Sequence, residues 1–535
     1  MSGNLTQPDP PPRNLPFPPL LFLAGTTGLF ILGFDLAYQQ LSSQALPGTP
    51  PLRIVHSFNS CSQPTQLCDG ALPIAGLFQQ PLTGLLYGTT VRGGRGDRGI
   101  IFRVNVNRSA SYQMLADFPC TPTQPQPTCR QGAEPQGRLL MLSDGYLYGT
   151  TFSGGVNSQP TRPGSGTIFR MLPGGQPIAL YHFKGCNQVT AGNCDGENPA
   201  AGLLLGSDGN LYGTTLNGGK GAGTVFQLRN GGRGWIYRQI YAFQGGPTDG
   251  SKPYGELIEG TDGAFYGTTY RGGTNGLGTL FRLRPTGTVW NRQLLYSFSG
   301  GNTGSGPQVG LLQANGPWLY GTTLDDRGTI FRFSLATNTL TTLYQFRGTD
   351  GAQPRSPLLL GSDNFLYGTT YVRSNPIGEN NGTIFKIHPD GGRLISLFIF
   401  KGSNGINPRG QLLQSRLDGN IYGITENRSW SPSCQTAGGC GQIFRLEVNL
   451  PIITNFMPRS GPPGANVMIS GVNLASRLGQ TQVSFAGVPA EVLFASNNQL
   501  RVRVPEQAGD GPITVTTVNT PNDTTTTTPL PFRVF

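Results

Sequence analysis

Charged side chains are scarce in this chain of 535 residues, and histidine is scarcer still. Asp, Glu, Lys and Arg together make up 12% of the residues, and there are only three histidines. Catalysis needs titratable groups that converge, and the sequence has no Gly-x-Ser-x-Gly, His-Glu-x-x-His or phosphate-cradling motif to supply them. We therefore expect neither a catalytic residue nor a bound cofactor.

Metal-binding cysteine motifs are also missing, although the chain has eight cysteines. A zinc site would need a Cys-x-x-Cys motif or a companion histidine, and neither is present. The cysteines instead fall into four close pairs, which in an exported chain favours disulfides that close short loops. The pairs are Cys61 with Cys68, Cys120 with Cys129, Cys186 with Cys194, and Cys434 with Cys440.

Long hydrophobic runs are confined to the N-terminus. No charge occurs between Arg13 and Asp35, and most residues of that stretch are apolar. A basic residue, an apolar core and small residues up to Ala45 are typical of a secretory signal. An uncleaved membrane anchor at residues 15–34 is the alternative. We assign residues 1–51 to this signal or anchor plus a linker, and we expect the rest of the chain in the periplasm or at the cell surface, secreted or anchored.

The formal net charge is +11, which raises the question of nucleic-acid binding. The arginines are spread along the chain rather than gathered in one basic patch, as nucleic-acid binding would require. We expect no nucleic-acid partner, and contact with a membrane only through the N-terminal segment.

Glycine, by contrast, is abundant, with 80 residues that recur at fixed positions. They belong to seven repeats spaced by roughly 47 to 65 residues. Each repeat has an aromatic-phenylalanine segment, a Leu-Tyr-Gly-Thr-Thr segment and a Gly-Thr-Ile-Phe-Arg segment. The tyrosines of the Tyr-Gly pairs are Tyr87, Tyr148, Tyr212, Tyr266, Tyr320, Tyr367 and Tyr422.

The pattern of each repeat predicts four short β-strands separated by turns. In the third repeat, for example, Asp208-Gly209 is a turn of the kind that hairpins prefer. Four strands with this period are typical of a propeller blade. We therefore predict an all-β protein with a seven-bladed β-propeller over residues 52–448.

The order of the segments predicts that the ring is closed. The aromatic-phenylalanine segment precedes the first Tyr-Gly strand, and none follows the last Gly-x-Ile-Phe strand, which ends at Phe444. An N-terminal strand from Arg53 to Phe58 can therefore complete the last blade and leave no open edge. An open solenoid, the alternative array, would need polar caps at its ends. The seven segments end at Phe58, Phe118, Phe183, Phe243, Phe298, Phe346 and Phe400.

Closure also predicts on which face of the propeller the loops lie. In a four-stranded antiparallel blade, the link from the second to the third strand shares one rim with the link to the next blade. All four cysteine pairs, and the largest differences in loop length, fall in these links. Variable loops on one rim of a rigid scaffold usually carry binding. A purely structural role for the disulfides, tying down long loops, is the alternative.

The repeat resembles the bacterial GloVer tandem repeat of choice-of-anchor surface proteins. The resemblance rests on Asp-Gly-x-Leu-Tyr-Gly-Thr-Thr followed by Gly-Thr-Ile-Phe-Arg, seven times between residues 52 and 447. Departures are small: Gln227 replaces the basic residue, Ile424 a Thr and Gln442 another Thr. The resemblance implies an exported, envelope-associated protein and no settled activity.

The C-terminal part, residues 449–535, has a different character. Val467-x-Ile469-x-Gly471 and Val483-x-Phe485-Ala486-Gly487 are alternating strand patterns. This part is similar to an IPT/TIG domain, an immunoglobulin-like β-sandwich, which in bacterial surface proteins implies a spacer or contact module. We expect the threonine run at 524–528 to be a polar loop.

Neither the aspartates nor the histidines make a convincing reactive site. The Asp of each Asp-Gly pair is what a tight turn demands. Calcium is conceivable where Asp195 and Glu197 lie together on the variable face, and these two are weak metal candidates. His56 and His182 occupy a repeat position that elsewhere holds Ala, Ser or Gln, and His388 follows a strand near a turn, so we expect no catalytic role for them.

The last residue of the Gly-Thr-Ile-Phe-Arg segment is basic in six of the seven repeats. These residues would form a ring of positive charge if they face solvent. If they lie between blades, each would stack on a neighbour's tyrosine or pair with an aspartate, and we favour this structural reading. The residues are Arg103, Arg170, Arg282, Arg332, Lys386 and Arg445.

Two functions are compatible with these patterns. The first is a non-enzymatic, exported binding, adhesion or scaffold protein of the cell envelope, whose partner is a polysaccharide or a surface protein held at the variable, disulfide-pinned face. The alternative is a propeller enzyme, a polysaccharide or lactone hydrolase or lyase, with its site at the central channel. The enzyme predicts a cluster of Asp, Glu or His at the mouth of that channel.

Overall fold

A computed structural model provides the structure of the chain. The N-terminal segment, including residues 15–34, and Cys61, Cys68 and Cys434 lie outside the described residues. Within the described residues, no helix is both long and apolar enough to cross a membrane. The described residues are 50–58, 69–106, 111–120, 129–156, 164–186, 194–232, 234–287, 289–314, 316–373, 381–427, 440–475, 481–517, 524–528 and 530–535.

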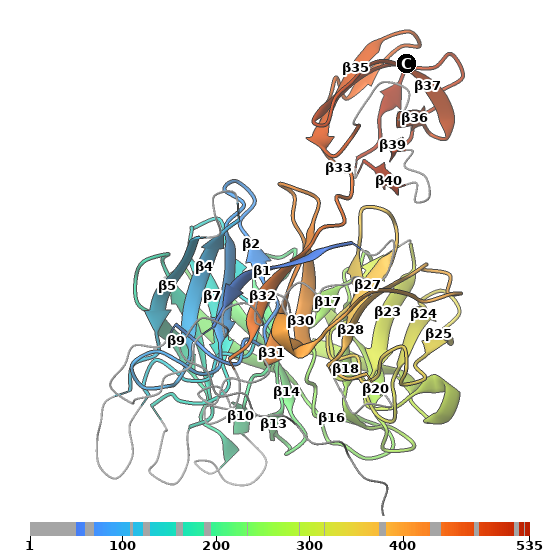
Figure 1. The fold of residues 1–535 in the computed structure, drawn as a ribbon. Helices are drawn as coiled ribbons and strands as arrows, with labels where there is room; N and C mark the ends of the chain where they lie inside the picture. The colour runs from blue at the N-terminus through green and yellow to red at the C-terminus, as the bar shows by residue number, and fades with distance from the viewer. Residues whose placement is uncertain are drawn as a thin grey trace, which may run out of the picture. The chain divides into compact units, whose positions relative to one another are not determined.

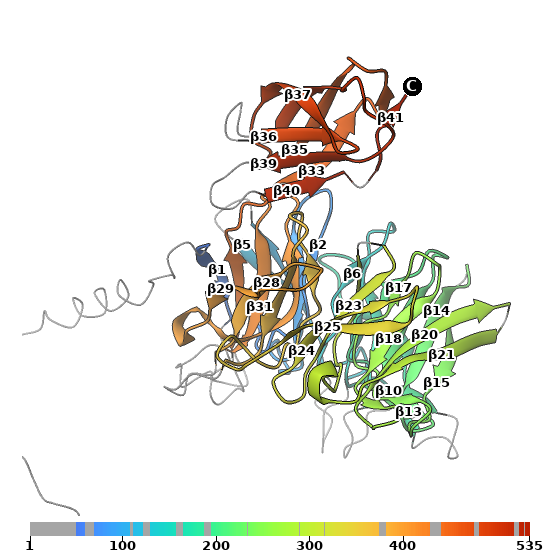
Figure 2. The ribbon, with the colours of Figure 1, turned by 90° about the vertical axis from the view of Figure 1, so that its right-hand side faces the viewer.

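Seven four-stranded antiparallel sheets form the predicted propeller (Figures 1 and 2). We number these blades in chain order, and the strands of each are given from the channel outward. Blade 1 contains β2 (Phe78–Gln79), β3 (Leu86–Thr90), β4 (Ile100–Asn105) and β5 (Ser111–Asp117); blade 2 contains β6 (Leu140–Met141), β7 (Leu147–Thr151), β8 (Thr167–Met171) and β9 (Ile178–His182); blade 3 contains β11 (Leu204–Leu205), β12 (Leu211–Thr215), β14 (Thr224–Asn230) and β15 (Trp235–Ala242); blade 4 contains β17 (Ile258–Glu259), β18 (Phe265–Thr269), β20 (Thr279–Thr286) and β21 (Val289–Ser297). Blade 5 contains β22 (Leu312–Ala314), β23 (Trp318–Thr323), β24 (Thr329–Ser334) and β25 (Thr339–Gln345); blade 6 contains β26 (Leu359–Leu360), β27 (Leu366–Thr370), β28 (Thr383–Ile387) and β29 (Ile395–Ile399); blade 7 contains β30 (Ile406–Gln414), β31 (Ile421–Asn427), β32 (Gln442–Leu446) and β1 (Leu52–Ser57).

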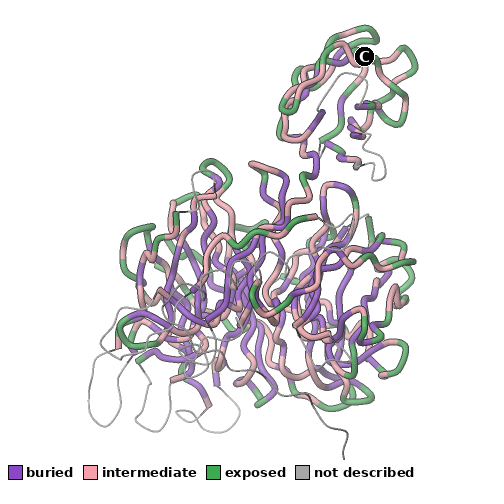
Figure 3. Tube along the Cα trace, viewed as in Figure 1, coloured by how far each residue is buried: buried purple, intermediate pink, exposed green. Residues whose placement is uncertain are grey.

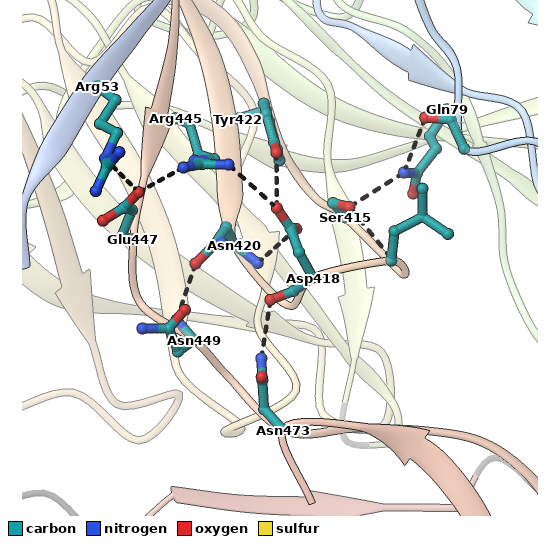
Figure 4. A network of polar contacts seen from close by, with 12 residues as sticks. Arg53, Gln79, Ser415, Asp418, Asn420, Tyr422, Arg445, Glu447, Asn449 and Asn473 are labelled. Carbon is teal, nitrogen blue, oxygen red and sulfur yellow. Dashed lines mark hydrogen bonds and ion pairs between the residues drawn. The ribbon is translucent and has the colours of Figure 1, made fainter. Parts of the chain in front are cut away.

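The predicted closure of the ring is confirmed. Strand β1 pairs antiparallel with β32, with Leu52 opposite Leu446 and Ser57 opposite Gln442. The N-terminal strand is therefore the outer strand of blade 7. A polar network reinforces this junction (Figure 4): the Glu447 carboxylate lies 2.6 Å from Arg53 Nε of β1 and 2.5 Å from Arg445 Nη2 of β32.

The hydrophobic core is divided among the seven interfaces between adjacent blades, each with its own cluster of buried side chains. The second and third strands of the blades are accordingly mostly buried (Figure 3), whereas outer strands such as β5 and β9 are largely half-buried or exposed. The phenylalanine of each aromatic segment packs edge-to-face on the Gly-Thr-Ile-Phe phenylalanine of the next blade, with ring centroids 5.2–5.5 Å apart. Phe58 makes this contact with Phe102, so blades 7 and 1 meet as the other pairs do.

A backbone contact also repeats at every blade interface. The residue that enters each innermost segment has a left-handed φ of 54–65° and is followed by proline. In the pair of blades 3 and 4, Lys252 donates its N–H to Ala222 O and accepts from Tyr270 N–H, at 2.8 and 3.0 Å. This conformation lets one residue bond to two blades at once. The seven residues are Leu72, Glu134, Asn198, Lys252, Gly306, Gln353 and Asn407.

Four short strands and two 3-10 helices lie in the links at the variable rim. β10 (Cys194–Glu197) pairs with β13 (Asn217–Gly219), and β16 (Gly250–Ser251) pairs with β19 (Arg271–Gly272). Each pair joins a link between blades to the second-to-third-strand link of the following blade, so the two kinds of link do share one rim. Two single-turn 3-10 helices, η2 (Gly301–Thr303) and η3 (Gly402–Asn404), follow the outer strands of blades 4 and 6.

The C-terminal part forms an immunoglobulin-like sandwich around one apolar cluster that includes Phe456, Phe485 and Phe532. The threonine run at 524–528 was expected to be a loop, and this expectation is wrong. It contains strand β40, because threonine is β-branched and its backbone completes the edge of β39. The strands are β33 (Ile452–Met457), β34 (Ser460–Gly461), β35 (Asn466–Val472), β36 (Thr481–Phe485), β37 (Val488–Ala495), β38 (Gln499–Arg503), β39 (Ile513–Thr517), β40 (Thr524–Thr527) and β41 (Arg533–Val534).

Candidate functional site

The aspartates of the first hairpin turns accept hydrogen bonds from the repeat tyrosines. In blade 2, Asp144 Oδ1 accepts the N–H of Tyr146 at 3.0 Å, and Oδ2 accepts the hydroxyl proton of Tyr148 at 2.7 Å. The same tyrosine–aspartate bond occurs in blades 3, 4, 6 and 7 at 2.7–2.9 Å. Both carboxylate oxygens of Asp144 thus accept hydrogen bonds within its own hairpin. These contacts agree with the turn role that we predicted for such aspartates.

The periodic basic residues lie on the third strand of six blades, opposite the repeat tyrosine, as with Tyr148 and Arg170, whereas blade 3 has Gln227 there. Arg170, Arg332 and Lys386 each stack on an aromatic residue, at 4.5, 4.4 and 4.4 Å from the ring centroid. The expected partner was a tyrosine of the neighbouring blade or an aspartate, and Arg332 and Lys386 do pair with aspartates. The stacking partners differ from the prediction, because adjacent strands of the same blade bring the stacking residue diagonally opposite the cation. The six residues therefore do not gather at one binding surface. The remaining contacts are Arg103 with Gln113, Arg282 with Gln293, Arg332 with Asp390, Lys386 with Asp363, and Arg445 with Glu447.

The histidines lie apart from one another. The His56 ring stacks on Tyr112 at 3.8 Å and its Nε2 lies 3.1 Å from Asp69 Oδ2. Burial lowers the pKa of His182, and the positive charge of Arg130 lowers it further. His388 Nδ1 accepts the Asp390 N–H at 3.2 Å. The Nδ1 of His182 is buried without a hydrogen-bond partner in the described part of the chain. The three rings lie in different blades and do not form a shared site.

The weak metal candidates lie on β10. Asp195 Oδ2 accepts the hydroxyl proton of Tyr181, and Oδ1 accepts the Lys184 N–H at 3.0 Å. Both oxygens of Asp195 are therefore engaged. Equivalent bonds tie Tyr241 to Asp249 and Tyr344 to Asp350, at 2.9 and 2.5 Å. Across the described residues, His, Cys, Asp and Glu side chains form no group of three that could hold a metal ion.

The cysteines that the structure describes are all in disulfides. Cys120–Cys129 and Cys186–Cys194 are bonded as predicted, in the links from blade 1 to 2 and from blade 2 to 3. Cys440 is also disulfide-bonded. The two described bridges lie on the rim that carries the second-to-third-strand links. The predicted pairing of Cys61 with Cys68 and the partner of Cys440 fall outside the described residues.

The central channel is lined by equivalent segments from all seven blades. Each segment follows the proline of its blade and enters the innermost strand. A cavity of about 90 Å³ lies among them. The segments are residues 74–76, 136–138, 200–202, 254–256, 308–310, 355–357 and 409–411.

The side chains on these segments differ from blade to blade, and the polar ones come from blade 2 and from blades 4 to 7. Blade 3 contributes only small residues to the channel, whereas blade 4 contributes Tyr254 and Glu256, blade 6 Arg355, and blade 7 Arg409. Further charged and aromatic side chains surround these at the variable-rim end of the channel. We call the whole set the arginine–tyrosine cluster. It consists of Tyr254, Glu256, Tyr270, Arg271, Asp325, Arg355, Tyr371, Arg409 and Glu426, together with Arg138.

Ion pairs and stacking connect the members of this cluster. On blade 4, Arg271 stacks over Tyr270 at 4.0 Å and its Nη1 lies 2.7 Å from Asp325 Oδ2 of blade 5. On blade 6, Arg355 stacks over Tyr371 at 4.1 Å. Its charge also acts on Tyr270, so the two stacked pairs lie close enough to interact.

Members of the cluster shift one another's pKa values. Burial raises the pKa of Tyr371, and Glu426 adds to the rise, whereas Arg355 and Arg409 oppose it. Burial alone would lower the pKa of Arg409, but Glu426, 3.1 Å away, raises it, with smaller contributions from Tyr254 and Tyr371. Charged and phenolic groups from blades 4, 6 and 7 therefore lie close enough to affect one another's pKa.

Sequence reasoning did not find this cluster. Its members lie between residues 138 and 426, and none recurs in all seven blades: Arg355 and Arg409 share one repeat position, and Tyr270 and Tyr371 share another. One signal was available: the positions after the repeat proline vary, while the proline itself recurs. The enzyme alternative predicted acids at the channel mouth. Acids are present there, but each faces an arginine: Glu256 with Arg138, Asp325 with Arg271, and Glu426 with Arg409.

Comparison with protein families gives two matches. The Gloeobacter/Verrucomicrobia repeat matches residues 123–326 and 319–472, more than half of the chain. The IPT/TIG domain matches residues 451–534. No curated protein matches the chain.

Three solved structures that match this chain each have a TM-score below 0.5. One is a candidate phosphatase from Bacteroides thetaiotaomicron, 26% identical over 16% of this chain and 18% of that chain, with a TM-score of 0.16. A second is a fungal alcohol oxidase of the AA5 family in complex with copper, 11% identical over 90% of this chain and 99% of that chain, with a TM-score of 0.48. A third is a candidate 6-phosphogluconolactonase from Bacteroides uniformis, 16% identical over 66% of this chain and 89% of that chain, with a TM-score of 0.39. The chain thus spans less than a fifth of the first protein, and these likenesses carry no functional argument.

Proposed function

We propose a binding function for this chain, which belongs to the Gloeobacter/Verrucomicrobia repeat family and carries a C-terminal IPT/TIG domain. The combination of a repeat propeller and an IPT/TIG domain favours a surface or binding protein. In our proposal the protein is exported to the cell envelope, acts without catalysis, and holds a polysaccharide or a surface protein at the variable face of the propeller.

One observation carries the proposal. Residues that recur in every blade engage one another within the fold, as Tyr212 does with Asp208. Residues that do not recur in every blade, such as Arg355 and Tyr254, line the channel and continue to the variable rim. Disulfides lie on the same rim, which supports both export and a rigid loop surface. The chemistry that distinguishes one blade from another is thus concentrated on one face.

The enzyme alternative has less support in the described residues. General acid–base catalysis needs an ionisable side chain positioned to exchange a proton with the substrate. At the channel mouth, Glu256, Asp325 and Glu426 are each paired with an arginine. These carboxylates are therefore engaged in holding arginines.

Screening the purified full chain against envelope polysaccharides and surface proteins tests the proposal. A ligand found in this way is then tested for the face it uses. The described residues include no free cysteine, so a single introduced cysteine can be labelled with a bulky polyethylene-glycol maleimide. Lys220→Cys places the label on an exposed turn of the variable rim, and Leu82→Cys places it on the opposite rim, where Leu82 is 94% exposed.

We expect the label at position 220 to block binding and the label at position 82 to leave it unchanged. The reverse pattern would show that the other face binds. If no ligand is found and the chain turns over a polysaccharide or lactone, the binding function is wrong and the enzyme alternative takes its place.

A further inference from the structure

The arginine–tyrosine cluster contains one positive charge in excess. Arg138 lies 3.3 Å from Glu256, Arg271 lies 2.7 Å from Asp325, and Arg409 lies 3.1 Å from Glu426. Arg355 has no carboxylate partner among the described residues. Its polar contact is a long one, with Nη2 3.5 Å from Gln353 Oε1.

Arg355 is held in place even though its charge is not balanced. Its guanidinium lies 4.1 Å over the Tyr371 ring, which fixes the plane of the group. Its Nε is buried without a hydrogen-bond partner. Because this atom is shielded from solvent, a ligand in the channel can reach the guanidinium group only through its terminal nitrogens.

The position of Arg355 makes it accessible from inside the channel. It lines the cavity of about 90 Å³ together with Arg409 and Tyr254. That space has room for several water molecules or for one small anionic group with part of the unit that carries it. A guanidinium group binds carboxylates through two parallel hydrogen bonds, which gives direction as well as charge.

Amide side chains line the same cavity. Gln136, Gln308 and Gln411 come from blades 2, 5 and 7 and are all half-buried. Each amide both donates and accepts hydrogen bonds, as sugar hydroxyls require. A cation beside several amides fits a ligand that has a carboxylate and hydroxyls on the same small ring.

We infer that the channel mouth is a binding site for acidic sugars, with Arg355 as the anchor for the sugar carboxylate. This inference rests on the proposed binding function and adds the class of the ligand. The carboxylate balances the excess charge of Arg355 and accepts hydrogen bonds from its terminal nitrogens, while the glutamines bond the ring hydroxyls. An acidic polysaccharide would place the carboxylate and part of one terminal sugar in the cavity, with the rest of the chain outside it.

Calorimetric titration of the purified full chain with an oligogalacturonate tests the inference. A carboxyl-reduced oligomer of the same length is the matched neutral probe, and inorganic phosphate and sulfate test whether any anion suffices. Arg355→Gln removes the charge, and Arg355→Lys keeps it without the planar fork. Arg332→Gln is the control, because Arg332 also stacks on an aromatic ring and has a buried, unpaired Nε, but pairs with Asp390 outside the channel.

We expect the acidic oligomer to bind, the neutral one to fail, and Arg355→Gln to weaken binding by about 10- to 100-fold. Arg355→Lys should lose less, and Arg332→Gln should bind as the wild type does. Equal binding by Arg355→Gln, when circular dichroism shows it folded, overturns the inference, as does equal binding of the neutral oligomer or of phosphate alone.

The outcomes also separate this inference from the proposed function. If the acidic oligomer fails but the screen finds another envelope ligand at the variable face, the ligand class is wrong and the binding function stands. If the screen finds no ligand of any kind, both are wrong.

Discussion

Single residues explain why the repeat tolerates so little change. Gly278 of blade 4 has a φ of +104°, and a Cβ there would lie 2.5 Å from Pro307 Cδ of blade 5 and 2.6 Å from Thr269 O. A Cβ built on the equivalent glycine of every blade would lie 2.4–2.7 Å from Cδ of the next proline, including Gly441 against Pro73 across the closing interface. Glycine at this position is therefore required by the distance between blades as well as by the backbone angle.

A pair of substitutions in one loop separates these two requirements. Gly276 has a φ of +70° with nothing within 4 Å of a built Cβ. Gly276→Ala should cost about 1 kcal/mol of unfolding free energy, from backbone strain alone. Gly278→Ala adds a clash with the next blade and should cost about 2–4 kcal/mol. Urea unfolding followed by circular dichroism measures both, and equal losses would mean that the contact with Pro307 has no energetic effect.

The buried tyrosines predict how stability depends on pH. Burial raises the pKa of Tyr148 from its ordinary value of 10 to about 12, and the hydrogen bond to Asp144 adds to the rise against the effect of Arg170. Burial, followed by Asp249 and Asp350 respectively, likewise raises the pKa of Tyr241 and of Tyr344 to about 12. Because these pKa values are higher in the folded state, the stabilisation is complete below pH 10 and is lost as the pH rises toward 12.

Absorbance at 295 nm, which reports tyrosinate, measures this effect directly. In urea the tyrosines should ionise near pH 10, whereas in the folded chain a large fraction should remain protonated until the protein unfolds. Tyr148→Phe removes one of these groups and should make the alkaline loss of stability less steep. Full ionisation near pH 10 while the circular dichroism spectrum stays native would contradict the account.

At the scale of elements, β1 decides whether seven blades form a ring. It is the outer strand of blade 7, although it is the first described strand of the chain. The cluster between blades 7 and 1 contains Phe58, which follows β1, and Ile443 of β32. Gln79 of blade 1 also donates to Ser415 of blade 7 at 3.2 Å (Figure 4). Without β1, the edge of β32 is open and the cluster between these blades is incomplete.

Removal of residues 50–58 should therefore destabilise the whole propeller and lead to aggregation through the exposed edge of β32. The midpoint of thermal unfolding and the mass measured by light scattering report the two effects. A synthetic peptide of residues 50–58 should restore much of both, because β-strand addition replaces the missing backbone bonds. A truncated chain that stays monomeric and equally stable would show that the closure contributes little.

The role of β1 could be predicted from the sequence, because it follows from the number and order of the repeated segments. Seven phenylalanine segments begin before the first Tyr-Gly strand and end before the last Gly-x-Ile-Phe strand, and both facts are visible without coordinates. The left-handed residue before each proline was not predicted. Residues before proline usually avoid compact backbone conformations, and here the bonds to two blades override that preference, as at Lys252.

At the scale of the whole molecule, the repeat brings together residues that are far apart in the chain. Tyr254, Arg355 and Arg409 belong to three blades, yet they line one cavity because each follows the repeat proline of its blade. Their position could have been predicted from the propeller, since the innermost segments of all blades face one channel. Which of them pair with a carboxylate could not, because those contacts cross between blades through side-chain geometry that spacing does not determine.

The central claim is that recurring residues build the propeller while the residues that differ bind at the channel mouth. Amide hydrogen exchange of the full chain, with and without oligogalacturonate, tests it most directly. We predict slower exchange in the ligand-bound chain at residues 254–256, 355–357 and 409–411, with no change in the outer strands or at the Asp-Gly turns on the opposite rim. Protection confined to those turns or to the IPT/TIG domain, or no protection anywhere, would contradict the account.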